Sequence, residues 1–230
     1  MKIEHLDSNK SKGAILAQTY NLASRTLSKG THVSQDIVVL LNKENVKNIL
    51  CAVPHEGDMH EDSAAEAISK ALDKNQLYAE EASTGRVNFR TPALSIVRYN
   101  RELIKKLNLV DESIAFSIVE HNQLLAKNDL IATLKIIPFF VSEIYVERVV
   151  SLISKNEIFK IHRLQEKKVE LIQTYYEWQK KSIFKATSNV TSSRLDALGC
   201  PLQKETLIPH DHKSLCSEIN LSIDLSLIHI

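Results

Sequence analysis

Apolar positions recur with a period of two in several short segments of the chain, which predicts β-strands. The clearest are SIAFSIV (113–119) and DLIATLKIIPFFV (129–141), whose alternation is typical of paired strands with one buried face. KGAILAQTY (12–20), NILCAV (48–53) and ALSIV (93–97) predict further strands, and 12–20 is expected to be the first strand of the fold.

A period near 3.6 residues predicts helices between these strands. Ser34 is a good N-cap for a short helix that runs through Leu41. Asp58 and Glu61 are three residues apart and resemble a capping box at the start of a second helix. A third, basic amphipathic helix lies within RYNRELIKKLNLVDES (98–113), and a fourth helix spans 142–155. The predicted inward faces are Ala64, Ala65, Ile68, Ala71 and Leu72 in the second helix, and Leu103, Ile104 and Leu107 in the third.

A polar, charged stretch at 155–168 predicts a domain boundary. After it, a strand at 169–176, a strand with a turn within 200–211 and a strand at 223–230 alternate with two helices, in the β-α-β-α-β order of a doubly wound sheet. The predicted fold class is therefore mixed α/β. It consists of an N-terminal α+β region, 1–155, followed by a partial doubly wound three-layer α/β domain, 166–230.

Composition narrows the function classes. A net charge of +1 gives no electrostatic reason to expect nucleic acid or an anionic membrane as a partner. Only 5 glycines are present, and they are widely spaced, which excludes a P-loop and a dinucleotide fingerprint within the chain. Three cysteines without C-x-x-C spacing predict neither a disulfide framework nor a zinc site. With no apolar secretion segment at the N-terminus, a cytoplasmic location is expected.

The segment STGRVNFRTP (83–92) reads as a loop, and it contains the most site-like residues. Gly85 tolerates positive φ, Arg86 offers a guanidinium fork, and Asn88 both donates and accepts hydrogen bonds. Together with Thr84 this set suits an anionic ligand, and the alternative is a structural turn with a solvated arginine. Because loop side chains are not needed by a core, we expect substitution of Arg86 or Asn88 to leave stability nearly unchanged.

Other polar residues offer weaker candidates for chemistry. Asp111 and Glu112 are adjacent carboxylates that open a strand, so they are expected on opposite faces and not on one ion. Lys135 is either a buried base or an outward residue of a half-exposed strand. The acidic run EGDMHED (56–62) suits the positive end of a helix dipole better than a metal loop. No tightly bound metal is predicted.

Five segments in this order resemble signatures of a known family. They are GAILAQTYNLASRTLSKGTHVSQDIVVLL (13–41), EGDMHEDSAAEAISKAL (56–72), STGRVNF (83–89), LVDESIAFSI (109–118) and LIATLKIIPFFV (130–141). The chain resembles bacterial molybdopterin-binding proteins of molybdenum cofactor biosynthesis. More narrowly, it resembles the type that begins with such a region, continues into an α/β domain and often ends in a nucleotidyltransferase-like half.

The resemblance implies a molybdopterin-binding protein acting in cofactor biosynthesis, with molybdopterin or Mo-molybdopterin as its ligand. The expected ligand-binding residues are Thr84, Gly85, Arg86, Asn88, Asp111 and Glu112. In the family the third strand of the α/β domain leads into a glycine-rich pocket loop, and this chain stops at Ile230, where that loop should begin. YYEWQKKSI (175–183) also departs from the family pattern. We therefore expect a truncated, catalytically inactive chain with weak or absent pterin affinity.

The uncovered flank of a sheet that ends at its third strand predicts that residues 169–230 are either held by an intermolecular contact or poorly ordered. A second copy of the chain, a molybdoenzyme and a nucleotidyltransferase are the candidate partners. The alternative function is accordingly a scaffolding module that docks a molybdoenzyme or a cofactor-synthesis partner.

Overall fold

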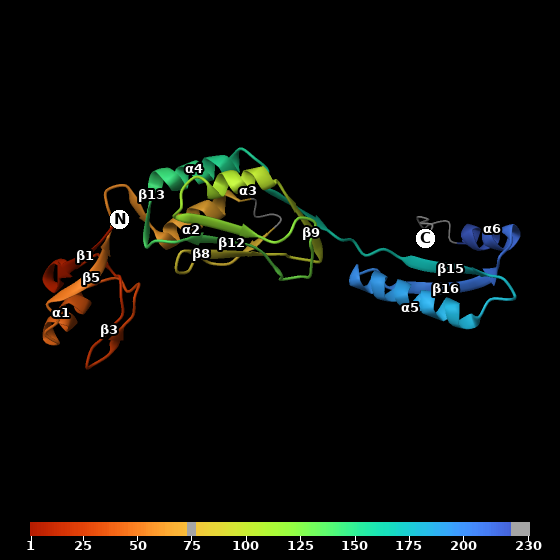
Figure 1. Cartoon of the computed structure of the whole chain (residues 1–230), viewed down its shortest axis with the longest axis horizontal. Coiled ribbons are helices and arrows are strands. Elements are labelled where there is room, and N and C mark those ends of the chain that lie inside the picture. Colours follow the sequence, from red (N-terminus) through yellow and green to blue (C-terminus); the bar gives the residue numbers. More distant parts are fainter. Residues whose placement is uncertain (73–76, 222–230) are drawn as a thin grey trace. The chain divides into compact units, whose positions relative to one another are not determined.

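The computed structural model describes residues 1–72 and 77–221 and has a mixed α/β fold, as the sequence predicts (Figure 1). The chain divides into two compact units, Met1–His162 and Arg163–Ile230. The division falls inside the charged stretch where the sequence places a boundary, while the assignment of the two regions to a molybdopterin-binding protein stays a prediction. None of the described helices is long and apolar enough to cross a lipid bilayer.

The first unit combines short strands with four α-helices in its described residues. In chain order these elements are β1 (Lys2–Asp7), a 3-10 turn (Ser8–Lys10), β2 (Ile15–Leu16), β3 (Tyr20–Asn21), β4 (Thr26–Leu27), α1 (Gln35–Lys43), β5 (Asn48–Val53), β6 (Asp58–His60), α2 (Glu61–Ala71), β7 (Tyr78–Ala79), β8 (Arg86–Arg90), β9 (Ser95–Tyr99), α3 (Arg101–Asn108), β10 (Ile114–Ile118), β11 (Leu124–Leu125), β12 (Leu130–Ile136), β13 (Phe140–Ser142), α4 (Glu143–Ser154) and β14 (Phe159–Arg163).

The N-terminal part of this unit is a three-stranded antiparallel sheet in the order β1-β5-β2. Helix α1 packs on it, and Leu16, Leu41 and Ile49 are fully buried in the shared core. The predictions for α1 and β5 are confirmed. The Ser34 side chain caps α1 by accepting a hydrogen bond from the backbone N–H of Ile37 at 3.4 Å.

The prediction of a first strand at 12–20 is wrong. Gly13, at φ +87, turns the chain just before β2, and a second short strand, β3, then pairs with β4 as a hairpin. The first strand is instead β1, whose sequence KIEHLD has only two apolar side chains, three residues apart. Such a spacing gives no period of two, and it is the antiparallel pairing with β5 that holds β1 in place.

The centre of the first unit is a four-stranded antiparallel sheet in the order β10-β12-β8-β7. The predicted pairing of 113–119 with 129–141 is confirmed by the pairing of β10 with β12. The same unit contains two smaller sheets, in the orders β11-β9-β14 and β13-β6.

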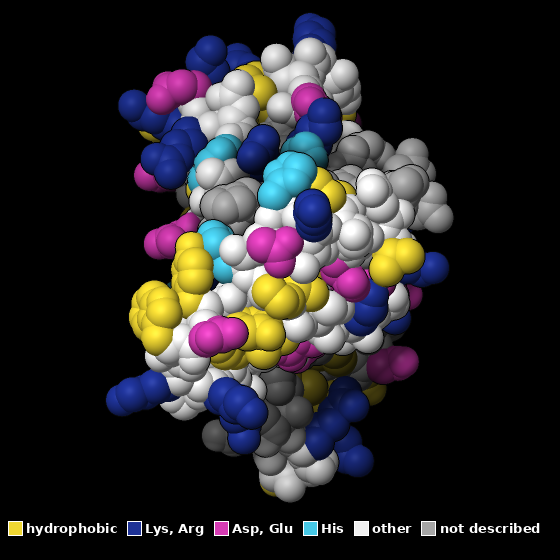
Figure 2. Space-filling view, turned by 90° about the vertical axis from the view of Figure 1, so that its right-hand side faces the viewer, with side chains coloured by type: hydrophobic (Ala, Val, Ile, Leu, Met, Phe, Trp, Pro, Cys, Tyr) yellow, Lys and Arg dark blue, Asp and Glu magenta, His cyan; other side chains and the backbone are white. Residues whose placement is uncertain are grey.

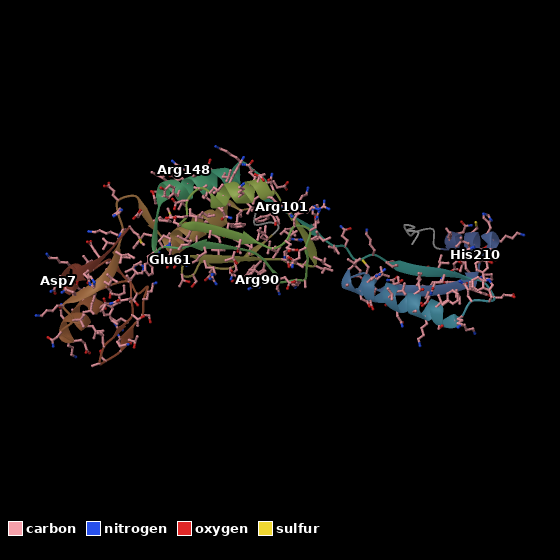
Figure 3. All side chains as sticks on the ribbon, viewed as in Figure 1. Asp7, Glu61, Arg90, Arg101, Arg148 and His210 are labelled. Atoms are coloured by element: carbon pink, nitrogen blue, oxygen red, sulfur yellow. The ribbon has the colours of Figure 1, made fainter. Side chains whose placement is uncertain are left out.

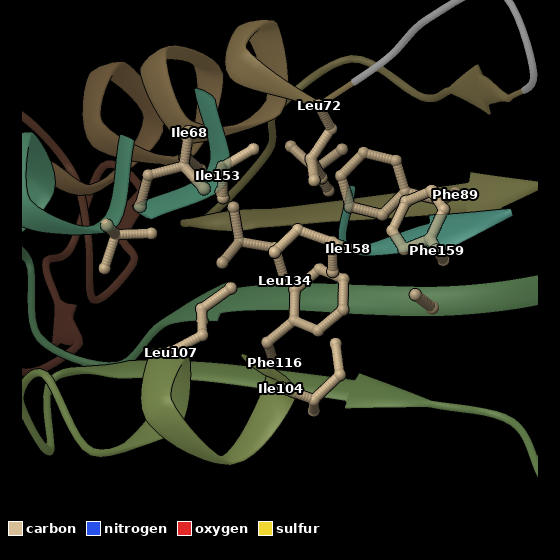
Figure 4. Close-up of a cluster of buried hydrophobic side chains, with 14 of the residues drawn as sticks. Ile68, Leu72, Phe89, Ile104, Leu107, Phe116, Leu134, Ile153, Ile158 and Phe159 are labelled. Atoms are coloured by element: carbon tan, nitrogen blue, oxygen red, sulfur yellow. The ribbon is translucent and has the colours of Figure 1, made fainter. Parts of the chain in front are cut away.

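One face of this sheet is buried under α2, α3 and α4 (Figure 4). The alternating residues Phe89, Phe116 and Leu134 point into this core from three neighbouring strands. Ile68 from α2 and Leu107 from α3 are fully buried against them, as their helical spacing predicts. The opposite face of the same strands is therefore left for polar side chains.

The prediction of a loop at 83–92 is wrong. Residues Arg86–Arg90 form β8, which lies between β12 and β7 in the sheet. Val87 and Phe89 are each 1% exposed, so the short RVNFR segment does alternate between a core face and a polar face. The sequence pattern misses this strand because only two apolar residues alternate in it, and because its arginines and the flanking glycine and proline are typical of a loop.

The second unit is a two-stranded parallel sheet of β15 (Val169–Tyr175) and β16 (Leu202–Pro209), with α5 (Lys181–Ala197) and α6 (His212–Leu221). The predicted order of these elements is confirmed, and Gly199 (φ +71) follows the end of α5 as a helix-terminating glycine does. The predicted third strand, 223–230, lies outside the described residues.

Packing in the second unit is polar to an unusual degree. Gln173 is the one buried side chain among its described residues, and its amide nitrogen donates hydrogen bonds to Ser188 at 2.9 Å and to Glu205 at 2.8 Å. Large apolar side chains remain outside, including Trp178 at 79% exposure. Apolar side chains gather in several places on the face drawn in Figure 2.

We expect limited trypsin digestion to cut first between the two units. Lys167 and Lys168 are exposed and lie in the segment between β14 and β15, where the backbone has no regular secondary structure. The N-terminal fragment should keep the melting temperature that the first unit shows in the whole chain, because its core lies within Met1–His162. Differential scanning calorimetry of the digest measures this, and unfolding of the fragment on cleavage would show that the units depend on each other.

Candidate functional site

Three segments that are far apart in the sequence meet at the start of α2. Its N-cap is His60, whose Nδ1 accepts a hydrogen bond from the backbone N–H of Asp62 at 3.2 Å. The predicted capping box of Asp58 with Glu61 is therefore wrong. Asp58 lies on β6 instead, and its carboxylate accepts from the backbone N–H of His55 at 2.8 Å.

The first two residues of α2 hold the turn before β8. Asp62 Oδ1 accepts a hydrogen bond from the backbone N–H of Gly85 at 2.6 Å. Glu61 is only 8% exposed, and its Oε2 lies 3.5 Å from Nζ of Lys135 on β12. Lys135 also donates a hydrogen bond to the carbonyl oxygen of Thr84. Residues from 56–62, 83–89 and 130–141 thus contact one another directly.

Gly85 is what allows this close approach. Its φ is +69, and a Cβ at this position would lie 2.6 Å from Glu61 Oε2 and 2.7 Å from the carbonyl oxygen of Ile136. That carbonyl belongs to the neighbouring strand, and the backbone N–H of Ile136 donates to the Gly85 carbonyl at 2.7 Å. Both the backbone conformation and the lack of a side chain are therefore required here.

The exposed face of the central sheet carries a patch of polar side chains in two rows, which we call the polar face. Ala115, Lys135 and Arg86 are partners across β10, β12 and β8. Ser117, Thr133 and Asn88 form the next row, two residues along each strand. Figure 3 labels Glu61 and Arg90, which lie near the two ends of this face.

Hydrogen bonds tie the second row to the edge of the sheet. Thr133 Oγ1 donates to Asn88 Oδ1 at 3.0 Å, and Asn88 Nδ2 donates to Glu80 Oε2 at 2.8 Å. Arg90 donates to the other oxygen of Glu80 and forms an ion pair with it. These bonds, from Arg90 first and then from Asn88, hold the pKa of the Glu80 carboxyl below its ordinary value. Their stabilising effect is present above the ordinary carboxyl pKa and is lost as the pH falls through the lowered one.

A hollow of about 310 Å³ lies beside the edge strand β10. Its lining includes Asn108, Glu112, Ala115, Ser117, Thr133 and Lys135. This volume is at the small end of the range for sites that take small molecules. The hollow therefore extends the polar face across β10 toward Glu112.

The predicted site residues separate into groups. Arg86 and Asn88 lie together on the polar face, Glu112 lies at the hollow, and the turn residues Thr84 and Gly85 support Lys135 and Asp62. Asp111 does not join them. Its Oδ1 accepts hydrogen bonds from the backbone N–H of Ser113 at 2.9 Å and from the Ser113 hydroxyl at 2.5 Å, which is a turn-forming arrangement.

Sequence reasoning missed Ser117 and Thr133 as members of the candidate site. Both occupy the polar positions of strands whose alternation was clear, so the face they share was available from the pattern. What the pattern lacked was the register, which places them beside Asn88. The sequence left open whether Lys135 is a buried base or an outward-facing residue. In the structure it faces outward, and its side chain is 33% exposed.

Within residues 1–72 and 77–221, no three His, Cys, Asp or Glu side chains gather in a way that could hold a metal ion. Asp58 and Asp62 accept hydrogen bonds from backbone N–H groups, and Glu61 contacts Lys135. No family model matches the chain, and no curated protein or solved structure shows significant similarity to it.

Replacing Gly85 with alanine should lower the free energy of unfolding by about 2 kcal/mol or more, because positive φ and a collision with backbone add together. Gly57→Ala is the matched control, since Gly57 has φ +80 but no atom within 4 Å of an added Cβ. The control should lose only about 1 kcal/mol. Urea denaturation measures both variants. Equal losses of unfolding free energy would show that Glu61 and Ile136 can move away from the added Cβ at no energetic cost.

Arg86 and Asn88 should differ in their effect on stability, unlike the expectation from a loop. Arg86 is exposed, and Arg86→Ala should change the free energy of unfolding by no more than about 0.5 kcal/mol. Asn88→Ala leaves Glu80 and Thr133 without their amide partner and should cost about 1–2 kcal/mol. Urea denaturation of both variants measures this, and a larger loss for Arg86→Ala than for Asn88→Ala would contradict the contacts described.

Proposed function

We propose that this chain is a molybdopterin-binding protein that acts in molybdenum cofactor biosynthesis. The observation that carries the proposal is the meeting of three of the resembling segments, 56–72, 83–89 and 130–141, at Glu61, Gly85 and Lys135. A resemblance spread over separate stretches has more weight when those stretches make one contact network beside a polar face.

The polar face suits the chemistry of a phosphorylated pterin. Arg86 and Lys135 are partners on neighbouring strands, and each carries a positive charge that favours an anionic phosphate. The Lys135 ammonium also lies 3.5 Å from the Glu61 carboxylate. Ser117 and Thr133 add hydroxyl groups that both donate and accept hydrogen bonds. These groups bind and orient a ligand, and the proposal is one of binding by this chain and not of catalysis.

A scaffolding role is the second candidate function. The observation that favours it is the exposure of large apolar side chains in the second unit, among them Trp178 at 79% and Leu221 at 77%. Exposed aromatic and aliphatic side chains of this size are common at protein–protein contacts. A molybdoenzyme or a cofactor-synthesis enzyme is the partner that this role requires.

Anaerobic titration with molybdopterin, followed by pterin fluorescence, tests the first proposal. We expect saturable binding that Arg86→Ala weakens by about tenfold, because a charged hydrogen bond to phosphate contributes about 1.5–3 kcal/mol. Lys127→Ala removes an exposed positive charge elsewhere in the first unit and serves as the control. Absence of saturable binding by the unmodified chain would reject pterin binding and favour the scaffolding role.

A further inference from the structure

The hollow beside β10 is lined mainly by residues of two neighbouring strands. Ala115 and Ser117 of β10 line it together with their register partners Lys135 and Thr133 of β12. Asn108, at the end of α3, also lines it, as do the apolar residues Ile114 and Phe116.

Asn108 also closes the edge of β10 to another strand. Its Oδ1 accepts a hydrogen bond from the backbone N–H of Phe116 at 2.7 Å, and its Nδ2 donates to the Phe116 carbonyl at 2.8 Å. These are the two backbone groups that an added strand would need at this residue. The hollow is therefore not suited to an extended peptide that pairs with the sheet.

Opposite charges stand at two places around the hollow. Glu112 lines it, and neither its carboxylate nor the guanidinium of Arg86 makes a hydrogen bond or an ion pair with any described residue. Lys135 lines the hollow, and its ammonium group contacts the Thr84 carbonyl and the Glu61 carboxylate. Arg86 does not line the hollow but is the register partner of Lys135 on β8. Ala115, the partner of Lys135 on β10, is three residues along the chain from Glu112. Three residues of extended chain span at most about 10 Å.

We infer that the hollow binds a planar nitrogen heterocycle with two adjacent N–H donors on one edge and an anionic group at the opposite end. Glu112 accepts both N–H groups through its two oxygens, as carboxylates do with guanidinium forks. Lys135 and Arg86 hold the anionic group, and Ser117 and Thr133 hydrogen-bond to the ring between them. A simple anion would leave Glu112 unpaired beside a negative charge, so it fits less well.

Phosphorylated pterins and guanine nucleotides share this chemistry, because both rings carry an amino group next to a ring N–H. Assignment to a pterin rests on the proposed function, whereas the heterocycle site itself does not. The two sources are separated by paired probes of which one carries the amino group and the other has an oxo group or hydrogen in its place. The pterin arm compares 6-carboxypterin with 6-carboxylumazine, and the nucleotide arm compares GMP with IMP.

Fluorescence and calorimetric titrations should show tighter binding of 6-carboxypterin than of 6-carboxylumazine, by about tenfold, since loss of a hydrogen bond to a charged group has that effect. Glu112→Gln should abolish the preference. Arg86→Ala should weaken both probes equally and reduce the dependence of binding on salt. Glu147→Gln removes an exposed carboxylate of α4 and should leave both the preference and the affinities unchanged.

Each outcome decides between the claims. Equal binding of the paired probes, a preference that survives in Glu112→Gln, or no saturable binding at millimolar concentration overturns the heterocycle site. A preference for GMP over IMP with no pterin binding keeps the site and rejects the proposed function. Molybdopterin binding that Glu112→Gln leaves unchanged keeps the proposed function and rejects the site. Unchanged melting temperatures, expected because Glu112 is exposed, show that the variants are folded.

Discussion

The contact between Glu61 and Gly85 is the constraint on which the candidate site depends. Because Gly85 has no Cβ, the Glu61 carboxylate can lie over the turn before β8 and still reach Lys135 on β12. One helix start, one turn and one strand are thereby held at fixed positions. Arg86 follows Gly85 directly, so the same turn sets where the guanidinium begins on the polar face.

The two faces of the central sheet have different roles: one packs in the hydrophobic core, and the other carries the candidate site. The core face carries Phe89, Phe116 and Leu134, packed under three helices. The opposite face carries the polar rows. Hydrogen bonds from Thr133 to Asn88 and from Asn88 to Glu80 fix the positions of these side chains, and the face stays exposed. A ligand site on a rigid sheet is positioned by the core beneath it, which suits recognition by a few fixed charges.

Prediction from the sequence succeeded where periodicity was strong and failed where it was short. The pairing of β10 with β12 and the helices α1 and α4 follow from apolar spacing alone. Strand β8 does not, because two apolar residues between arginines resemble a loop. Strand β1 does not either, since its stability comes from its pairing with β5, and the chain between them contains three other strands and a helix. In each failure, long-range pairing outweighed the local pattern.

The candidate site shows the same division. The sequence by itself determined the fold class, the side chains able to bind an anion, and a glycine in 83–89 that tolerates positive φ. It determined these because side-chain chemistry and backbone freedom are local properties. Only the tertiary structure decided that Arg86 stands beside Lys135, that Glu112 faces a hollow and that Asp111 does not. Strand register and the packing of α2 against the sheet depend on contacts between residues far apart in the chain, and no local pattern contains them.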